Sequence, residues 1–188
     1  MSFMATNVAI LASGSGSNFQ NIAESDLDIT IKVLIVDNPN AYAIERAKKL
    51  DIPYRVVDRK HYTKETFEKE ILDILKECDV ELVVLAGFMK ILSPNFISKY
   101  EDKIINLHPS LLPSFKGPEG IKDAFEYGVK VTGVTVHYVD SGIDTGKIIA
   151  QEAVGVEDTD TLETLEEKIH EIEYRLYIEA LKMVLEEL

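Results

Sequence analysis

The chain has 188 residues, with 33 acidic and 20 basic side chains and a formal net charge of −13 at pH 7. Because affinity for nucleic-acid backbones comes from clustered Lys and Arg, this charge argues against unaided binding of nucleic acid, a tRNA substrate included. The single cysteine, Cys78, excludes a disulfide framework and a cysteine metal cluster, and it suits a reducing cytoplasm.

The first residues, MSFMATN, lack a basic region followed by a long apolar stretch. No run of the sequence approaches the ~20 apolar residues of a membrane helix. We therefore expect a soluble, unprocessed cytoplasmic protein that forms one domain over residues 1–188, either as a monomer or as a homodimer.

Strands and helices are predicted to alternate along most of the chain. Apolar runs bounded by turn residues predict strands at 8–11, 31–36, 54–57, 82–86 and 104–105. Helical spacing of apolar side chains predicts helices at 19–23, 41–50, 64–76 and 121–127. The fully apolar run at 82–86 is typical of a parallel strand covered on both faces. This order predicts an α/β fold with a doubly wound, mostly parallel sheet.

The last third of the chain departs from this alternation. Two β-rich runs, 132–139 and 147–156, are joined by a connection too short for a crossover helix, so they should pair antiparallel and make the sheet mixed. One long helix follows at 161–188, with Thr161 as its cap and an inward apolar side. The inward residues are Leu162, Leu165, Ile169, Ile172, Leu176 and Leu181. Its many glutamates are interpreted as a solvated face, with Glu173 kept aside.

A glycine-rich turn follows the first strand. Gly14 and Gly16 permit a tight turn and close backbone approach, and Ser15, Ser17 and Asn18 add polar side chains. This pattern predicts a site for a phosphate-bearing ligand, and the alternative is an ordinary glycine turn without a ligand. The dinucleotide fingerprint lacks its third glycine, yet Asp37 follows the second strand where a ribose-binding acid would stand, so a degenerate cofactor site stays open.

Asn106 and His108 follow the apolar pair 104–105 and lie two residues apart. On an extended chain such residues point the same way, here at the carboxyl end of a strand, where open α/β sheets place their sites. Asp144, in the loop between the two late β-rich runs, could fold over the same edge. An amide donor, an imidazole and a carboxylate suit acyl transfer to an amine, which needs oxyanion stabilisation and a route for a proton.

Each of these residues has a plainer interpretation. His108 could cap a loop carbonyl, and Asp144, flanked by glycines, could be a turn aspartate. His137 alternates within a β-run and is interpreted as structural or pocket-lining. His61 and His170 lack partners at metal-ligand spacing and are interpreted as surface residues.

With these motifs together, the chain resembles the phosphoribosylglycinamide formyltransferases, the folate-dependent glycinamide ribonucleotide transformylases of purine synthesis. The resemblance runs nearly end to end, through ASGSGSN at 12–18, LAGFM at 85–89, ILS at 91–93, NLHPSLLPSFKG at 106–117, 133–139, Asp144 and 160–161. It implies a Rossmann-type formyltransferase fold and transfer of a formyl group from 10-formyltetrahydrofolate to the primary amine of glycinamide ribonucleotide, without a metal.

The resemblance also implies residue roles. Asn106, His108 and Asp144 match the catalytic residues of the family. The residues matched to substrate and phosphate binding are Ser15, Gly16, Ser17, Asn18, Lys64 and Glu173. Those matched to folate binding are Phe88, Met89, Lys90, Ile91, Leu92, Val139 and Asp140.

Several rivals share parts of this pattern. Methionyl-tRNA formyltransferase and formyltetrahydrofolate hydrolase carry an additional domain, for which we expect no room, and sugar-amine formyltransferases share the fold. From another class, a non-catalytic nucleotide-binding sensor could use the glycine turn and Asp37, but it would need neither Asn106, His108 nor Asp144.

Overall fold

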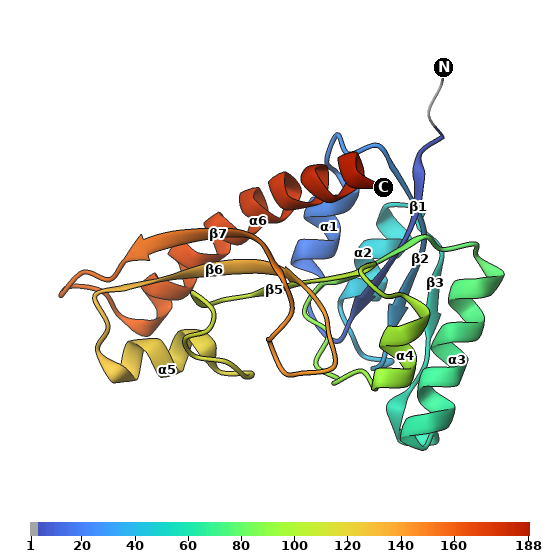
Figure 1. Cartoon of the computed structure of the whole chain (residues 1–188), viewed down its shortest axis with the longest axis horizontal. Coiled ribbons are helices and arrows are strands. Elements are labelled where there is room, and N and C mark those ends of the chain that lie inside the picture. Colours follow the sequence, from blue (N-terminus) through green and yellow to red (C-terminus); the bar gives the residue numbers. More distant parts are fainter. Residues whose placement is uncertain (1–3) are drawn as a thin grey trace. The chain divides into compact units, whose positions relative to one another are not determined.

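The computed structural model describes residues 4–188. The expectation about the first residues, MSFMATN, falls partly on residues 1–3 and to that extent lies outside the described residues. Strands and helices alternate along most of the chain (Figure 1). The hydrogen-bonded strands follow the order β3-β2-β1-β4-β5-β6-β7. The chain divides into two compact units, one ending at Ile105 and the other running from Asn106 to Leu188, so the boundary falls inside strand β5 (Ile104–His108). The single-domain expectation stays a prediction.

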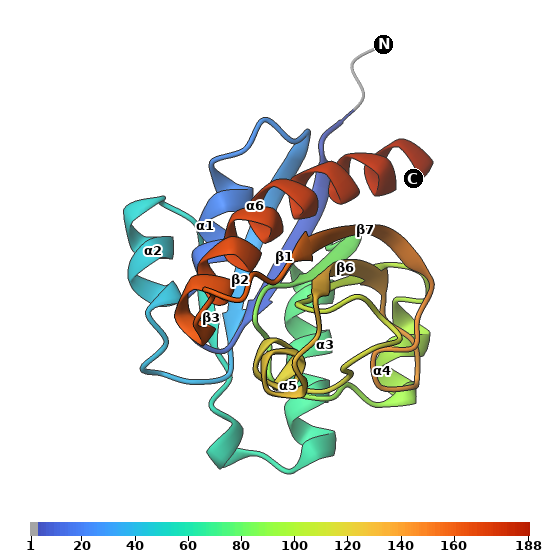
Figure 2. The same cartoon turned by 90° about the vertical axis from the view of Figure 1, so that its left-hand side faces the viewer.

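The first unit is an alternating α/β structure. Its elements are β1 (Thr6–Ala12), α1 (Ser17–Ala23), β2 (Ile29–Val36), α2 (Ala43–Lys49), β3 (Tyr54–Val56), the 3-10 turn η1 (Arg59–His61), α3 (Lys64–Glu77), β4 (Leu82–Leu85), α4 (Pro94–Lys99) and the start of β5 (Ile104–His108). All its strand pairs are parallel, as predicted. Helices α1 and α2 lie on one side of its strands, and α3 and α4 on the other (Figure 2).

Burial explains why these strands read as unbroken apolar runs. Residues 8–12 of β1, the last four residues of β2 and all of β4 are buried. Parallel strands covered on both faces have no solvent side on which polar residues could alternate. Polar side chains are therefore concentrated in the loops at the strand ends.

The glycine turn between β1 and α1 requires glycine at one position in particular. Gly16 has a φ of +74°, and a Cβ atom added there would lie 2.6 Å from the Cβ atom of Ala43. The backbone N–H of Ala43 also donates to the Gly14 carbonyl at 3.1 Å. The turn thus lies tightly against the start of α2, and a side chain at Gly16 would separate them.

The second unit contains the rest of β5 and four further elements. These are α5 (Gly120–Tyr127), β6 (Val131–Tyr138), β7 (Ile148–Gly155) and α6 (Leu162–Glu187). Strands β6 and β7 pair antiparallel, which confirms the expected mixed sheet. Helix α6 runs along this hairpin and contacts both strands (Figure 1). Its N-terminus is capped by Thr161, as predicted: the Thr161 hydroxyl accepts from the Thr164 N–H, and the Thr161 N–H donates in return to the Thr164 hydroxyl.

Three local expectations differ from the structure. Helix α4 and the turn η1 were not predicted, because six and three residues are too few to show a helical period. The signal for α4 was present nonetheless, since Ser93 caps it and Pro94 occupies its first turn. Leu162 is only half-buried, because it begins α6 beside the exposed cap.

Candidate active site

Strand β5 places Asn106 and His108 as the sequence predicted, at its carboxyl end and two residues apart. The two isoleucines before them are buried in the sheet, Asn106 is half-buried and His108 is buried. The strand therefore holds both side chains on a rigid element. Rigid placement matters for a reacting group because small displacements lower catalytic rates strongly.

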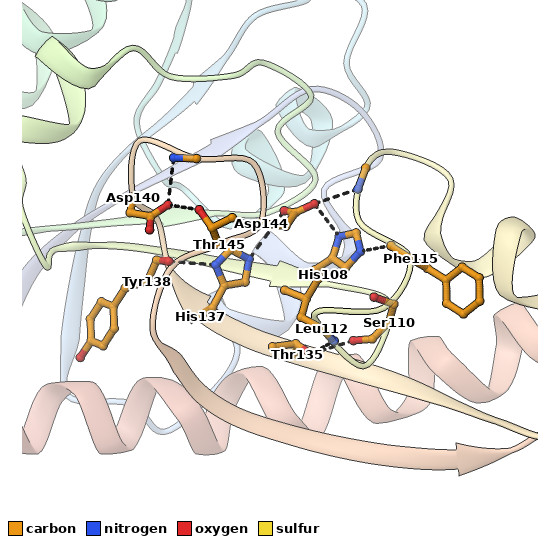
Figure 3. A network of polar contacts seen from close by, with 12 residues as sticks. His108, Ser110, Leu112, Phe115, Thr135, His137, Tyr138, Asp140, Asp144 and Thr145 are labelled. Atoms are coloured by element: carbon orange, nitrogen blue, oxygen red, sulfur yellow. Dashed lines mark hydrogen bonds and ion pairs between the residues drawn. The ribbon is translucent and has the colours of Figure 1, made fainter.

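Both ring nitrogens of His108 face an acceptor (Figure 3). Nε2 lies 2.8 Å from the carbonyl oxygen of Phe115, and Nδ1 lies 3.6 Å from Oδ2 of Asp144. His108 thus contacts a loop carbonyl, as its plainer interpretation expects, and it also pairs with Asp144. A carbonyl oxygen can only accept, so Nε2 carries a proton here, and an imidazolium would serve both acceptors.

Asp144 joins this imidazole to the loop after β5. Its Oδ2 accepts a hydrogen bond of 2.9 Å from the backbone N–H of Gly117, and its side chain is 14% exposed. Asp144 and Phe115 have positive φ angles of 52° and 50°. Such conformations cost non-glycine residues roughly 1–3 kcal/mol each and cluster at functional sites. Here they hold the two residues whose oxygen atoms face His108.

The loop that carries Asp144 is itself internally bonded. Oδ1 of Asp140 accepts from the Gly142 N–H at 3.0 Å and from the Thr145 hydroxyl at 2.5 Å. The Thr145 hydrogen bond, helped by that of Gly142, lowers the pKa of Asp140 below its ordinary value. A Cβ at Gly146 would lie 1.7 Å from the Tyr138 carbonyl oxygen, so this turn closes tightly on β6.

His137 lies on the other side of Asp144 (Figure 3). Its Nδ1 is 2.8 Å from the carbonyl oxygen of Tyr138, and its Nε2 is 3.9 Å from Oδ1 of Asp144. Burial is the main cause that lowers the pKa of His137 below its ordinary value, so the neutral ring is favoured near pH 7. This histidine therefore belongs to the polar cluster rather than to the apolar core.

A buried hydroxyl anchors the loop after His108. Oγ1 of Thr135, on β6, donates to the Ser110 carbonyl at 2.7 Å and accepts from the Leu112 N–H at 3.1 Å and from Nε2 of Gln151 at 3.0 Å. Gln151 also donates to the Leu112 carbonyl at 2.9 Å. Sequence reasoning missed this network, whose only local signal was a polar residue within an apolar strand.

Glu173 is buried on α6, in contrast to the exposed glutamates Glu163, Glu167 and Glu171. Its Oε2 lies 2.9 Å from Nδ1 of His170, which is half-exposed. Val139 and Asp140, matched to folate binding, lie where β6 ends and its loop begins. The second unit thus contains the three residues matched to catalysis, Asn106, His108 and Asp144. It also contains Glu173, matched to substrate binding, and Val139 and Asp140, matched to folate binding.

The glycine turn lies in the first unit, where an arginine that sequence reasoning missed contacts it. Arg46 Nε donates to the Ser15 carbonyl at 2.8 Å, and Nη1 donates to Gln20. Oδ1 of Asn18 is buried without a hydrogen-bond partner among the described residues. A basic side chain late in the second helix was visible in the sequence, but only packing of α2 against the turn brings it there.

The folate-matched segment 88–92 also lies in the first unit and is bonded at both ends. The Met89 N–H donates to the Ser13 hydroxyl at 2.9 Å, and the buried Glu68 accepts from the Ser93 N–H at 2.8 Å. Between them, Met89 and Ile91 are exposed, whereas Phe88 and Leu92 are buried.

Two lysines of the first unit, Lys90 and Lys64, are matched to folate and substrate binding respectively. Nζ of Lys90 lies 3.8 Å from Oδ2 of Asp37, which is buried and so makes a poor partner for a ribose at an open cofactor site. Lys64 is exposed at the first residue of α3.

Residues 4–188 show neither a metal-binding cluster nor a membrane-spanning helix. Within that range no three His, Cys, Asp or Glu side chains gather in a way that could hold a metal ion. Over the same residues, each helix is too short or too polar to cross a membrane.

Comparisons with known proteins agree with the resemblance seen in the motifs. The family described as Formyl transferase matches residues 6–181. A phosphoribosylglycinamide formyltransferase of Bacillus subtilis is 45% identical over 182 residues, which are 94% of this chain and 93% of that protein. The trifunctional purine biosynthetic protein adenosine-3 of Gallus gallus is 46% identical over 94% of this chain, which spans 18% of that longer protein.

A solved structure extends this agreement to the fold. The crystal structure of phosphoribosylglycinamide formyltransferase from Bacillus halodurans superposes with a TM-score of 0.93 and 49% sequence identity, covering 96% of this chain and 95% of that one. The predicted fold class, a mostly parallel α/β sheet that becomes mixed at its C-terminal side, is thereby confirmed. This chain is therefore a member of the formyl transferase family.

Proposed function

We propose that this chain transfers the formyl group of 10-formyltetrahydrofolate to the primary amine of glycinamide ribonucleotide, giving formylglycinamide ribonucleotide in purine synthesis. The observation that carries the proposal is the pairing of His108 with Asp144 at 3.6 Å, two residues beyond Asn106 on β5. It occurs in a chain that is 45% and 49% identical to two phosphoribosylglycinamide formyltransferases.

Asn106 and His108 are proposed to stabilise the oxyanion. Attack of the amine on the formyl carbon places negative charge on the formyl oxygen, and donors aimed at that oxygen lower the barrier. The amide of Asn106 supplies a donor that does not titrate, and His108 supplies an imidazole proton. The Phe115 carbonyl accepts the Nε2 proton in this structure, so the developing oxyanion would compete with it for His108.

Asp144 is proposed to hold the imidazole and to assist proton movement. The amine must lose a proton as the new C–N bond forms, and the folate nitrogen must gain one as the old bond breaks. The carboxylate of Asp144 faces His108 and is fixed by the Gly117 N–H, so it can serve this step with little reorganisation. These groups require no metal for the transfer.

The ribonucleotide is proposed to bind through its phosphate to the glycine turn, where Ser15, Gly16, Ser17 and Asn18 match the family. The guanidinium of Arg46 beside Ser15 supports this, because it places a positive charge at the turn of a chain that is strongly acidic overall. Lys64 and Glu173 are proposed as further substrate contacts.

The formyl donor is proposed to be a folate. The segment 88–92, which is hydrogen-bonded at both ends, supports this. Its exposed Met89 and Ile91 could pack against the aromatic ring of a folate, and the Lys90 ammonium could pair with a folate carboxylate. The proposed folate contacts of this segment are Phe88, Met89, Lys90, Ile91 and Leu92. Val139 and Asp140 are proposed as further folate contacts.

A formyl-transfer assay tests the proposal. Synthetic glycinamide ribonucleotide is compared with glycine and with an amino sugar lacking a phosphate, each with 10-formyltetrahydrofolate. We expect turnover of the ribonucleotide to exceed that of both comparison amines by several orders of magnitude. Equal turnover of the amino sugar, or none of the ribonucleotide, would contradict the assignment. Calorimetry with a folate analogue and, separately, with an adenine dinucleotide distinguishes the formyltransferase from the nucleotide-binding sensor. The sensor should bind the dinucleotide and not the folate analogue.

A further inference from the structure

His137 directs a ring nitrogen that has no hydrogen-bond partner among the described residues toward Asp144. A carbonyl oxygen accepts hydrogen bonds only, so the 2.8 Å contact with Tyr138 places a proton on Nδ1 of His137. In the neutral ring, Nε2 then carries a lone pair. This nitrogen is buried without a hydrogen-bond partner among residues 4–188, and Oδ1 of Asp144 lies 3.9 Å from it.

Nε2 of His137, which is buried, and Oδ1 of Asp144, whose side chain is 14% exposed, are two acceptors that face each other, and one proton can lie between them. With His137 neutral, its Nε2 has no donor among the described residues, and one added proton between Nε2 and the Asp144 carboxylate would serve both acceptors. The other carboxylate oxygen is already occupied by the Gly117 N–H and faces His108. The carboxylate thus has one side toward the reacting imidazole and one side toward a buried base.

Resting on the function proposed above, we propose that His137 is a positioning residue that acts through Asp144 and holds the transferred proton between bond formation and bond cleavage. As the amine nitrogen bonds to the formyl carbon, its N–H bond breaks and the proton passes to Asp144, where Nε2 of His137 shares it. As the bond between the formyl carbon and the folate nitrogen breaks, the same proton goes to that nitrogen. The cycle takes up and returns one proton.

The charged surroundings of His137 fit this role. Burial lowers the pKa of His137, the carboxylates of Asp144 and Asp140 raise it, and His108 lowers it. The net shift is downward from 6.5, so the ring is neutral and able to accept a proton near pH 7. In acid, a proton on Nε2 of His137 would leave this nitrogen unable to accept the transferred proton, and turnover should then fall.

The first test compares His137→Gln with His61→Gln, a control at an exposed histidine of the first unit. Glutamine retains hydrogen bonding but cannot accept a proton. We expect His137→Gln to lower kcat by about 10²-fold, the low end of general acid–base effects, with the KM of each substrate within about twofold. The acid limb of the kcat profile below pH 6.5 should disappear, and His61→Gln should match the parent chain.

The second test does not depend on turnover. Nitrogen-15 NMR of the histidines in the parent chain should show His137 with its proton on Nδ1 and a pKa below 6.5. Because the Asp144 carboxylate raises this pKa, Asp144→Asn should lower it further.

The outcomes separate the two proposals. An inactive parent chain would contradict the proposed function, whereas an active parent with an unchanged acid limb in His137→Gln would overturn only the role of His137. A proton on Nε2, or a His137 pKa unmoved by Asp144→Asn, would overturn that role as well, even if the glutamine variant failed to fold.

Discussion

The two units bury polar side chains to different extents. In the first unit they are Asp37 and Glu68; in the second they are His108, Ser110, Thr132, Thr135, His137 and Glu173. Buried polar groups must be hydrogen-bonded or paired, so the second unit requires an internal network where the first requires mainly apolar packing. The first unit is thus a mainly apolar frame that carries the glycine turn and the segment 88–92 on its loops, whereas the second holds His108, His137 and Asp144 in a polar network.

The strongest test of this contrast is Asp144→Asn in the second unit. The amide can still accept from the Gly117 N–H but cannot take a proton, so the fold should persist while kcat falls by about 10²–10⁴. Steady-state formyl transfer and thermal unfolding measure the two effects. Near-normal turnover would remove Asp144 from the chemistry and break the contrast.

The matching change in the first unit is Leu34→Ala. Leu34 is fully buried on β2, and truncating such a side chain costs about 2–5 kcal/mol of unfolding free energy. Because no proposed catalytic residue contributes to this core, kcat per folded molecule should stay close to that of the parent. Denaturant unfolding with an active-site titration checks both values. Val131→Ala, at a 55% exposed position, is the control and should shift stability by about 0.5 kcal/mol or less.

Thr135→Val sharpens the contrast, because it alters packing and chemistry together. The valine removes one donor and one acceptor from the loop network, leaving the Ser110 carbonyl and the Leu112 N–H without this partner. We expect a loss of about 1–3 kcal/mol of unfolding free energy and a smaller fall in kcat than in Asp144→Asn. Thr135→Ser retains the hydroxyl and should recover kcat. Full activity in the valine variant would show that the loop is held by other contacts.

The smallest effect is expected at His170. Its hydrogen bond with Glu173 raises the pKa of His170 above 6.5, so this pair stabilises the fold fully below pH 6.5 and loses that contribution as the pH rises through the raised value. The imidazole is half-exposed, so the contribution should be about a few tenths of a kcal/mol. Urea unfolding of the parent chain and His170→Gln should differ more at about pH 5.5 than at about pH 8.5. A larger difference in alkali would contradict the sign.

Much of the fold could be predicted because its signals are local. Unbroken apolar runs identified the parallel strands, and Thr161 and Gly128 marked where helices begin and end. The i, i+2 spacing of Asn106 and His108 was enough to place both residues at the end of one strand. These features depend on a few neighbouring residues and on the periods of strands and helices.

Other features were decided by packing between distant segments. Arg46 reaches Ser15 across 31 residues, and Thr135 reaches Leu112 across 23. The lone pair of His137 faces Asp144 only because the Tyr138 carbonyl takes the opposite nitrogen, and no sequence period encodes that choice. Local sequence patterns therefore predict most of the helices and strands and the residue types available for chemistry. Tertiary structure decided which atoms donate to which, because hydrogen-bond direction depends on contacts that form only when the chain folds.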